Sequence, residues 1–518
     1  MIIGLALILL ALIGAPLFSL FGAASMSLFM SMPEGTWASV AIDVFSAKFA
    51  EDPNLMTIPL FTFAGYLLAE AGTPQRLVEL SRSWLGWMPG GLAAVCLMAS
   101  AFFTTFTGGS GITIVAVGAL LFPALMSEKY PENFSMGLVT TGGSLGLLFP
   151  PSVPLILYGI VAGLVIDKVL VAGILPGIVV VLALMVYGGY VGMRYGVKRS
   201  GFSMGPALQA LWIAKWEVAI PIVLVGGFAS GLLRVHEACA FTAVYVLFIE
   251  VVLYRDIDIR RDLPRIIVES MTLVGAILII MATAIGFTSW MIQAQIPMQL
   301  LEWMESVVSS KLLFLLTLNV FLLVVGMLMD IFTAIVVVVP LILPMAYAYG
   351  VDPYHLAIIF LLNLEIGYLT PPVGINLFIS SIRFGKPVTY LYTAVLPFIG
   401  ILFIALMIVT YVPGITTVVP NMLKRDDDST AQYIDKDAQR GAIGADAGLG
   451  GDLGLDDEDL GLTKEEMEEL GLDPEDLGLD EEDLGLEAGD DEAQEPTDQP
   501  ADEAEQPTGE AADQQPAE

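Results

Sequence analysis

Apolar segments long enough to cross a bilayer recur along this chain of 518 residues. A spanning helix needs about 20 mostly apolar residues, and within hydrocarbon only helices or closed barrels satisfy every backbone hydrogen bond. Spans are expected near residues 1–13, 15–32, 55–72, 134–165, 168–192, 214–233, 236–254, 266–291, 355–383 and 388–414. The chain is therefore predicted to be an all-α polytopic membrane protein.

Charge divides the sequence into two parts at Arg425. Of the 55 Asp and Glu residues, 34 follow Arg425, against only three of the 22 Lys and Arg. Low hydrophobicity, high charge and a recurring Leu-Gly-Leu predict that residues 426–518 form a disordered acidic tail. Two roles stay open for this tail, a solvating or halotolerance role and the binding of a partner through its leucines.

Basic loops predict the orientation in the membrane, because Lys and Arg concentrate on the cytoplasmic side. Two such loops are separated by two spans, so both are expected inside. Their basic residues are Arg194, Lys198, Arg199 and Lys215 in one loop, and Arg255, Arg260, Arg261 and Arg265 in the other. This assignment places both termini, and the acidic tail, on the periplasmic side, although Lys424 and Arg425 mildly oppose it.

Two further apolar stretches, near 90–126 and 311–349, are interrupted in their middle. The interruptions are Thr107-Gly108-Gly109-Ser110-Gly111 and Gly326-Met327-Leu328-Met329-Asp330. A polar or glycine-rich break in an apolar stretch of this length indicates a chain that turns back within the membrane. Each stretch is predicted to be a re-entrant hairpin.

An internal repeat relates the two halves at a constant offset of 221 residues. Pro150-Pro151 pairs with Pro371-Pro372. Pro123 with Pro344, Gly65 with Gly286, and Gly146 with Gly367 share that offset. An odd number of crossings separates equivalent points, so the second copy is expected to be inverted, an architecture typical of secondary transporters.

The predicted repeats are residues 1–210, with a broken helix at 134–165, and residues 211–425, with a broken helix at 355–383. A simple helix kink is the alternative explanation for one Pro-Pro pair, but two copies beside two hairpins favour breaks.

Proline removes backbone donors and frees the carbonyls of the preceding turn. A small hard cation can take such oxygens, while the freed amides of the next half-helix favour an anion. Na⁺ with an organic anion satisfies both. The candidate Na⁺ ligands are Thr107, Ser110, Gly146, Phe149, Pro151, Gly326, Met329, Gly367, Thr370 and Val373. The candidate substrate-binding residues are Gly108, Gly109, Ser152, Asp330 and Asn376.

Asp330 and Glu365 are acids in apolar surroundings, which indicates an ion or substrate path. A hydrogen-bonded structural acid is the alternative for each. Asn376 is expected either to donate to substrate or to cap a helix end.

Over residues 2–425 the chain resembles the large membrane subunit of TRAP transporters, the tripartite ATP-independent periplasmic type. The marks of the resemblance are Ile58-Pro59-Leu60-Phe61, Met88-Pro89-Gly90-Gly91, the first hairpin tip, Gly146-Leu147-Leu148-Phe149-Pro150-Pro151, and Leu369-Thr370-Pro371-Pro372-Val373-Gly374-Ile375-Asn376. The family usually shows a Ser-Gly-Ser tip where Thr107-Gly108-Gly109-Ser110 stands here, so the hydroxyls persist but the exact ligands differ.

The resemblance implies an elevator mechanism in a bacterial inner membrane, with Na⁺ as coupling ion and a small carboxylate, such as a C4-dicarboxylate or sialic acid, as cargo. It also implies a small four-helix membrane subunit and a periplasmic substrate-binding protein as partners. The alternative is a stand-alone Na⁺/dicarboxylate symporter that needs no binding protein. An enzyme is not expected, because no catalytic set is evident, and no nucleic-acid partner is expected.

Overall fold

The computed structural model describes residues 15–31, 53–197, 201–230, 233–308 and 310–422. These residues belong to one compact unit, Met1–Ala447. They are helical throughout and contain no strand, which confirms the predicted all-α class. Seven helices are long and apolar enough to cross a membrane, or up to ten if each bent pair is one span. The predicted span 1–13 and the acidic tail lie outside the described residues.

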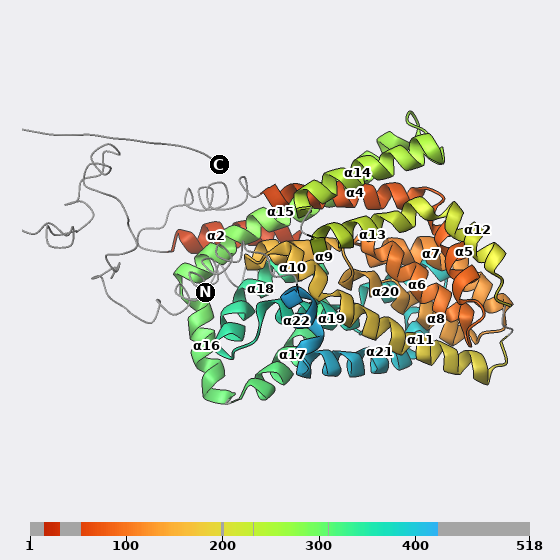
Figure 1. Ribbon diagram of the computed structural model, residues 1–518. Coiled ribbons are helices and arrows are strands. Elements are labelled where there is room, and N and C mark those ends of the chain that lie inside the picture. The colour runs from red at the N-terminus through yellow and green to blue at the C-terminus, as the bar shows by residue number, and fades with distance from the viewer. Residues whose placement is uncertain (1–14, 32–52, 198–200, 231–232, 309, 423–518) are drawn as a thin grey trace, which may run out of the picture. The chain divides into compact units, whose positions relative to one another are not determined.

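The first half holds one hairpin and one broken helix (Figure 1). The hairpin is α6–α7 and the broken helix is α8–η3–α9. The elements are α2 (Leu17–Phe29), η2 (Pro53–Met56), α4 (Thr57–Glu70), α5 (Thr73–Leu85), α6 (Gly91–Thr107), α7 (Ser110–Ser127), α8 (Glu132–Gly142), η3 (Leu145–Leu148), α9 (Val153–Ala162), α10 (Ile166–Ala172) and α11 (Ile174–Arg194).

The second half has the same order, a hairpin followed by a broken helix. Its hairpin is α17–α18 and its broken helix is α19–α20. The elements are α12 (Met204–Ile213), α13 (Lys215–Ser230), α14 (Val235–Phe248), η4 (Ile249–Leu253), α15 (Asp262–Gln293), α16 (Ile296–Val307), α17 (Lys311–Leu328), α18 (Ile331–Ala348), α19 (Pro353–Gly367), α20 (Ile375–Phe384), α21 (Val388–Tyr411) and α22 (Gly414–Met422).

Both predicted hairpins are confirmed, and their turns have different chemistry. The first turns at Gly108, whose φ of 61° lies in the left-handed region that favours glycine. The second turns at Asp330, whose carboxylate accepts a hydrogen bond from the amide of Thr333 and so caps α18. The outer arms α7 and α18 keep the 221-residue offset at both ends.

Both predicted helix breaks are confirmed. The first broken helix bends by 45° between η3 and α9. In the second, α19 ends at Gly367 and α20 begins at Ile375. The peptide bonds Pro150-Pro151 and Pro371-Pro372 are both cis. A simple kink would keep the helix continuous, so the kink interpretation is wrong for both copies.

Three short helices, α5, α12 and α16, were not predicted, because each has at most 13 residues and is too short to produce the apolar stretch of a span. α5 bends away from α4 by 74°, and α12 from α13 by 72°. The predicted span 168–192 also differs, since it begins earlier and divides into α10 and α11 at Gly173. The predicted division of the repeats at residue 210 falls within α12, and the extent of each repeat stays a prediction.

The outer arm of each hairpin packs against the broken helix of the other half. The hairpin arm α7 packs against α20 of the second broken helix, and α18 packs against α9 of the first. Thr140 on α8 donates a hydrogen bond of 2.8 Å to Ser380 on α20. In Figure 1, α20 accordingly lies among α6, α7 and α8. Such reciprocal contacts are those expected when two repeats are related by a two-fold axis.

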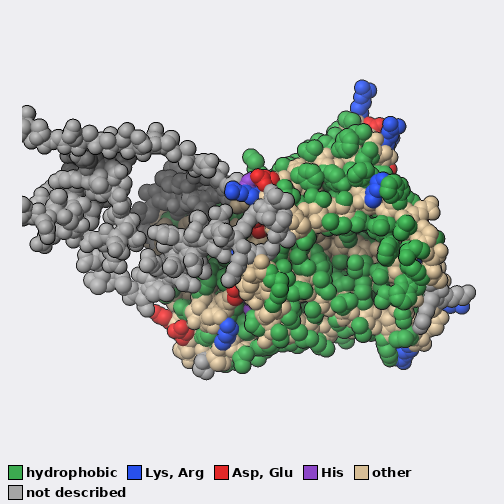
Figure 2. Space-filling view, viewed as in Figure 1, with side chains coloured by type: hydrophobic (Ala, Val, Ile, Leu, Met, Phe, Trp, Pro, Cys, Tyr) green, Lys and Arg blue, Asp and Glu red, His purple; other side chains and the backbone are tan. Residues whose placement is uncertain are grey.

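The surface is mainly apolar, with Lys and Arg gathered at the ends of the body (Figure 2). Several basic residues of the body form ion pairs with acids. Arg82 pairs with Glu128 at 3.5 Å, and Lys386 pairs with Glu132 at 2.6 Å. The hydrogen bond to Glu132 raises the pKa of Lys386. Arg76 on α5 binds Glu217, Glu250 and Asp256, and so joins α5 to α13 and η4.

Candidate transport site

The first hairpin is bound to the first break by threonine hydroxyls. Thr104 donates to the carbonyl of Gly143 at 2.9 Å, and Thr105 donates to the carbonyl of Gly146 at 3.2 Å. These carbonyls lie where the regular backbone ladder of the helix stops. The inner arm of the hairpin therefore supplies part of what the break has lost. The Gly146 carbonyl, a candidate Na⁺ ligand, also accepts from the amide of Phe149.

Close backbone approach fixes the same junction. A Cβ at Gly146 would lie 2.2 Å from the carbonyl oxygen of Ala101 on α6, a distance that no side chain tolerates. At the tip, a Cβ at Gly108 would lie 3.1 Å from the Val153 side chain at the start of α9. The hairpin tip and the second half-helix are thus neighbours, and Gly108 and Gly109 lie beside the amide end of α9.

The tip residues predicted to supply oxygen ligands for Na⁺ lie at this junction. Thr107 and Ser110 are buried, and the Thr107 hydroxyl lies 3.4 Å from the Gly109 carbonyl. The carbonyl of Ser110 lies close to Gly143, 3.0 Å from where a Cβ would stand. Hydroxyl and carbonyl oxygens are ligands that hard cations accept.

The second hairpin meets the second break differently. Gly326 on α17 packs against Gly367, where a Cβ would lie 2.4 Å from the Gly326 carbonyl carbon. The Tyr368 hydroxyl accepts a 2.6 Å hydrogen bond from the amide of Ile331, at the start of α18. Both oxygens of Asp330 accept from Thr333, at 3.1 Å from its amide and 2.6 Å from its hydroxyl. Asp330 therefore acts as a helix cap in this state, as the structural alternative expects.

The two breaks also differ in exposure. Pro150, Pro151 and Ser152 are buried, whereas Pro371, Pro372 and Val373 are exposed, with 40% of Val373 accessible. The Thr370 hydroxyl donates to the carbonyl of Ile366. Met329 is half-buried at the second tip.

Three buried side chains near the breaks keep polar atoms without a protein partner among the described residues. These atoms are the Ser152 hydroxyl, both amide atoms of Asn376, and both carboxylate oxygens of Glu365. All three side chains have no accessible surface. Buried polar groups are nearly always hydrogen-bonded, so unpaired ones require a ligand, a solvent molecule or an ion. Glu365 has no hydrogen-bond partner among the described residues, and its place on an ion or substrate path stays a prediction.

Ser152 and Asn376 lie near the N-termini of the two second half-helices, although the 221-residue offset does not pair them with each other. Ser152 is the N-cap of α9, and Asn376 lies one residue inside α20. Helix N-termini attract anions through their free amides and macrodipole. The unpaired amide of Asn376 and hydroxyl of Ser152 are therefore suited to an anionic cargo.

Sequence reasoning missed the residues that hold the hairpins to the breaks. Thr104, Thr105 and Tyr368 were not selected, although two threonines one turn before a glycine-rich tip are a readable signal. It also missed a buried polar chain in the second half, in which Asn363 donates to Asn319 at 2.7 Å and Asn319 to Thr410 at 3.3 Å. Among the described residues, no group of three or more His, Cys, Asp and Glu could hold a metal ion.

Comparison with known families decides what this arrangement belongs to. Residues 4–415 match the family model described as the tripartite ATP-independent periplasmic transporter, DctM component. The chain belongs to the DctM family. It is the large permease component of a membrane transporter, and not an enzyme, as the sequence predicted.

Characterised relatives of this DctM-family chain agree. It is 34% identical over 390 residues to the C4-dicarboxylate TRAP transporter large permease protein DctM of Pseudomonas aeruginosa, covering 74% of this chain and 90% of the relative. It is 34% identical to the isethionate TRAP transporter permease protein DctMQ of Oleidesulfovibrio alaskensis, over 70% of this chain and 57% of the relative. It is 31% identical to the sialic acid TRAP transporter large permease protein SiaM of Vibrio cholerae, over 71% and 86%.

Proposed function

We propose that this DctM-family permease imports an organic acid, coupled to Na⁺, by an elevator movement of its two hairpins and two broken helices. The observation that carries the proposal is the meeting of each hairpin with its helix break, beside buried polar atoms that have no protein partner. Buried polar atoms are nearly always hydrogen-bonded, so atoms left unpaired at this junction are suited to a ligand. A cargo and its driving ion satisfy them during transport.

The anion is favoured by the half-helix starts. α7, α9, α18 and α20 all begin at a hairpin tip or a break, and each N-terminus carries partial positive charge. The first tip lies against α9 and α20, through Gly108 with Val153 and Gly111 with Ile379. The relatives are named for C4-dicarboxylate, isethionate and sialic acid, and each of these compounds carries an acid group. A carboxylate or a related organic acid is the matching cargo.

The cation is favoured by neutral oxygens at the same tips. Thr107 and Ser110 offer hydroxyls and carbonyls at the first tip, and Thr370 offers a hydroxyl and a carbonyl at the second break. Na⁺ takes such uncharged oxygens without needing a carboxylate cage. The proposed ligand set is the one predicted from sequence.

The partners follow from the family. Relatives are named large permease proteins, which implies a smaller membrane subunit, and the family name implies a periplasmic binding protein that delivers the cargo. The protein then resides in a bacterial inner membrane, with the acidic tail on the periplasmic side. A stand-alone Na⁺/dicarboxylate symporter is the competing reading, favoured if purified permease alone accumulates its cargo.

Uptake in vesicles tests the coupling ion. Permease, small subunit and binding protein from the same operon are reconstituted, and labelled cargo is offered with an inward Na⁺ gradient or with choline in its place. Uptake against a gradient is expected only with Na⁺. Undiminished accumulation in choline would rule out Na⁺ coupling while leaving the organic-acid assignment intact.

Cysteine cross-links test the elevator movement, in a background with Cys96 and Cys239 replaced by Ala. Met98 on α6 and Val225 on α13 are changed to Cys and joined by a flexible bis-maleimide, which bridges a hairpin to a connecting helix. Uptake is expected to stop. The matched control pair is Thr140→Cys with Ser380→Cys, whose hydroxyls lie 2.8 Å apart within the moving unit, and its disulfide is expected to leave uptake in place. Full uptake in the bridged pair would contradict a movement at this boundary.

A further inference from the structure

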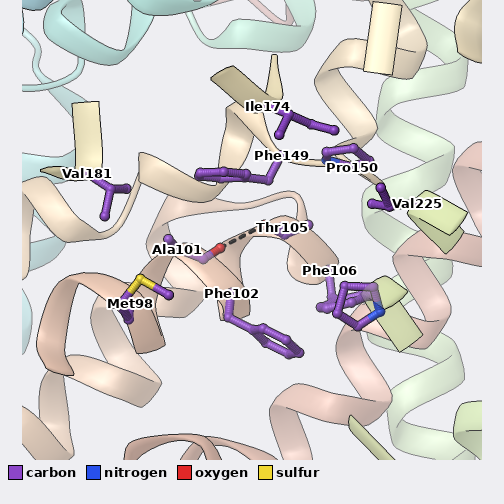
Figure 3. Close-up of a pocket in the computed structure, with 11 residues that line it drawn as sticks. Met98, Ala101, Phe102, Thr105, Phe106, Phe149, Pro150, Ile174, Val181 and Val225 are labelled. Carbon is purple, nitrogen blue, oxygen red and sulfur yellow. Dashed lines mark hydrogen bonds between the residues drawn. The ribbon is translucent and has the colours of Figure 1, made fainter. Parts of the chain in front are cut away.

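An apolar pocket lies beside the first helix break, between the break, α6, α11 and α13 (Figure 3). Its volume is about 220 Å³. Three membrane helices and the break itself form its walls. The lining residues are Met98, Ala101, Phe102, Thr105 and Phe106 of α6, Phe149 and Pro150 of the break, Ile174 and Val181 of α11, and Pro221 and Val225 of α13.

The lining has no charge and one polar side chain. Thr105 directs its hydroxyl to the carbonyls of Ala101 and Gly146, at 2.7 and 3.2 Å, so it offers little to a polar guest. A carboxylate cargo would have no partner here. Apolar cavities of about 150 Å³ stay dry and bind apolar guests. Because sites for drug-sized molecules measure about 300–1,000 Å³, a narrow apolar chain is the better fit.

The pocket opens onto the lipid-facing surface. Met98 lines it and is 42% exposed. Exposed apolar side chains flank it on both neighbouring helices, Ile178 and Leu182 on α11 and Ile222 and Val223 on α13. In a bilayer these side chains contact hydrocarbon, so acyl chains are the apolar groups present at the opening. From this continuity we propose that the acyl chain of a bilayer phospholipid inserts into the pocket.

The inserted acyl chain would contact two parts of the protein that the proposed elevator movement separates. Phe149 and Pro150 belong to the broken helix, and the Phe149 ring packs against Gly177 of α11. Val225 reaches toward Pro150 from α13 (Figure 3). A ligand shifts a conformational equilibrium only by binding one state better. An inserted chain therefore stabilises the present arrangement and slows transport, a consequence that rests on the proposed function.

Photo-cross-linking tests the binding itself. The permease, with the subunits that co-purify with it, is reconstituted with phosphatidylcholine carrying a diazirine on its acyl chain, and labelled residues are identified by mass spectrometry. Labels are expected on Met98, Phe102 and Val225. Val225→Phe fills the pocket, so labelling of Phe102 is expected to fall about ten-fold through steric exclusion. The matched control is Val223→Phe, on the same helix but facing lipid, which is expected to keep it.

A second variant guards against misfolding. Met98→Trp narrows the opening from an exposed position, and it is expected to reduce labelling of Phe102 in a protein that stays monodisperse. Equal labelling of Phe102 in the wild type, Val225→Phe and Met98→Trp would overturn the proposal. Labels found on a helix of the small subunit would also overturn it, because that helix would then occupy the pocket.

Uptake gives the second readout. Val225→Phe mimics a permanent guest and is expected to lower the uptake rate, with Val223→Phe near wild type. Since the labelling needs no transport, a failed lipid site and a failed assignment of Na⁺-coupled uptake are told apart.

Discussion

The first and second helix breaks have matching sequences but different surroundings. The first is enclosed, with Pro150, Pro151 and Ser152 buried and two carbonyls bound by threonines of the hairpin. The second leaves Pro371, Pro372 and Val373 exposed. Its hairpin carries Val325 and Gly326 where the first carries Thr104 and Thr105, so the two threonine hydroxyl bonds are missing there, and the side-chain bond of that junction runs from the Ile331 amide to the Tyr368 hydroxyl.

This difference shows that the repeat supplies a common scaffold whose two copies are specialised. The enclosed break is joined to its hairpin through side-chain bonds with defined directions. The exposed break is joined through Gly326 against Gly367 and through Tyr368 with Ile331.

The largest effect is expected from adding a methyl group to the glycine that each break buries. Gly146→Ala would place Cβ 2.2 Å from the Ala101 oxygen, and Gly367→Ala would place it 2.4 Å from the Gly326 carbonyl carbon. Each should destabilise the protein by at least about 3 kcal/mol and abolish uptake, because backbone cannot yield as a side chain does.

Thermal unfolding in detergent and vesicle uptake measure this. Gly400→Ala on α21, where a Cβ would meet nothing within 4 Å, is the matched control. If only one of the two variants loses stability and uptake, the two glycine contacts are not equally close.

A smaller effect is expected at the threonine hydroxyls that join the first hairpin to its break. Thr104→Val keeps the shape but leaves the Gly143 carbonyl and the Thr113 hydroxyl with one partner fewer. The loss should lower the free energy of unfolding by about 1–3 kcal/mol. Thr317→Val removes a hydroxyl bonded to Leu313 on an exposed helix face, and should change it little. Equal melting temperatures for the two variants would remove the distinction between the breaks.

Asp330 tests the second hairpin. Asp330→Ala removes the cap of α18 and should cost about 1 kcal/mol, while Asp330→Asn should retain the cap. Asp352 caps α19 in the same way, accepting from the His355 amide at 2.9 Å, and is the matched control. If the charge of Asp330 serves an ion or the cargo, Asp330→Asn lowers uptake at unchanged melting temperature, whereas Asp352→Asn leaves uptake intact. Equal uptake in both Asn variants would assign Asp330 to structure alone.

The smallest change in stability is expected at the unpaired polar groups. Ser152→Ala and Asn376→Leu each remove an atom that has no protein partner, so stability should change by less than about 1 kcal/mol. Their KM for the cargo should nevertheless rise, because these groups are proposed to contact it. An unchanged KM together with unchanged stability would remove both from the site.

Much of the fold was readable from the sequence because its signals are local. Pro150-Pro151 and Pro371-Pro372 remove donors wherever they stand, and Gly108 permits a left-handed turn. The hairpins, the breaks and their offset were therefore predicted correctly. Short helices such as α5 were missed, since a half-polar helix of 13 residues has no hydropathy peak as long as a span.

The sequence by itself determined that this chain belongs in a membrane, that two helices break, and that each break has a hairpin beside it. The tertiary structure decided which hydroxyl meets which carbonyl, that α7 crosses to α20 and α18 to α9, and that one break is enclosed while the other is exposed. The physical reason is that a helix break depends on a few neighbouring residues of the chain. The partners of the carbonyl oxygens at that break are instead set by tertiary packing. Thr104 and Gly143 lie far apart in sequence and meet only when α6 lies against the break.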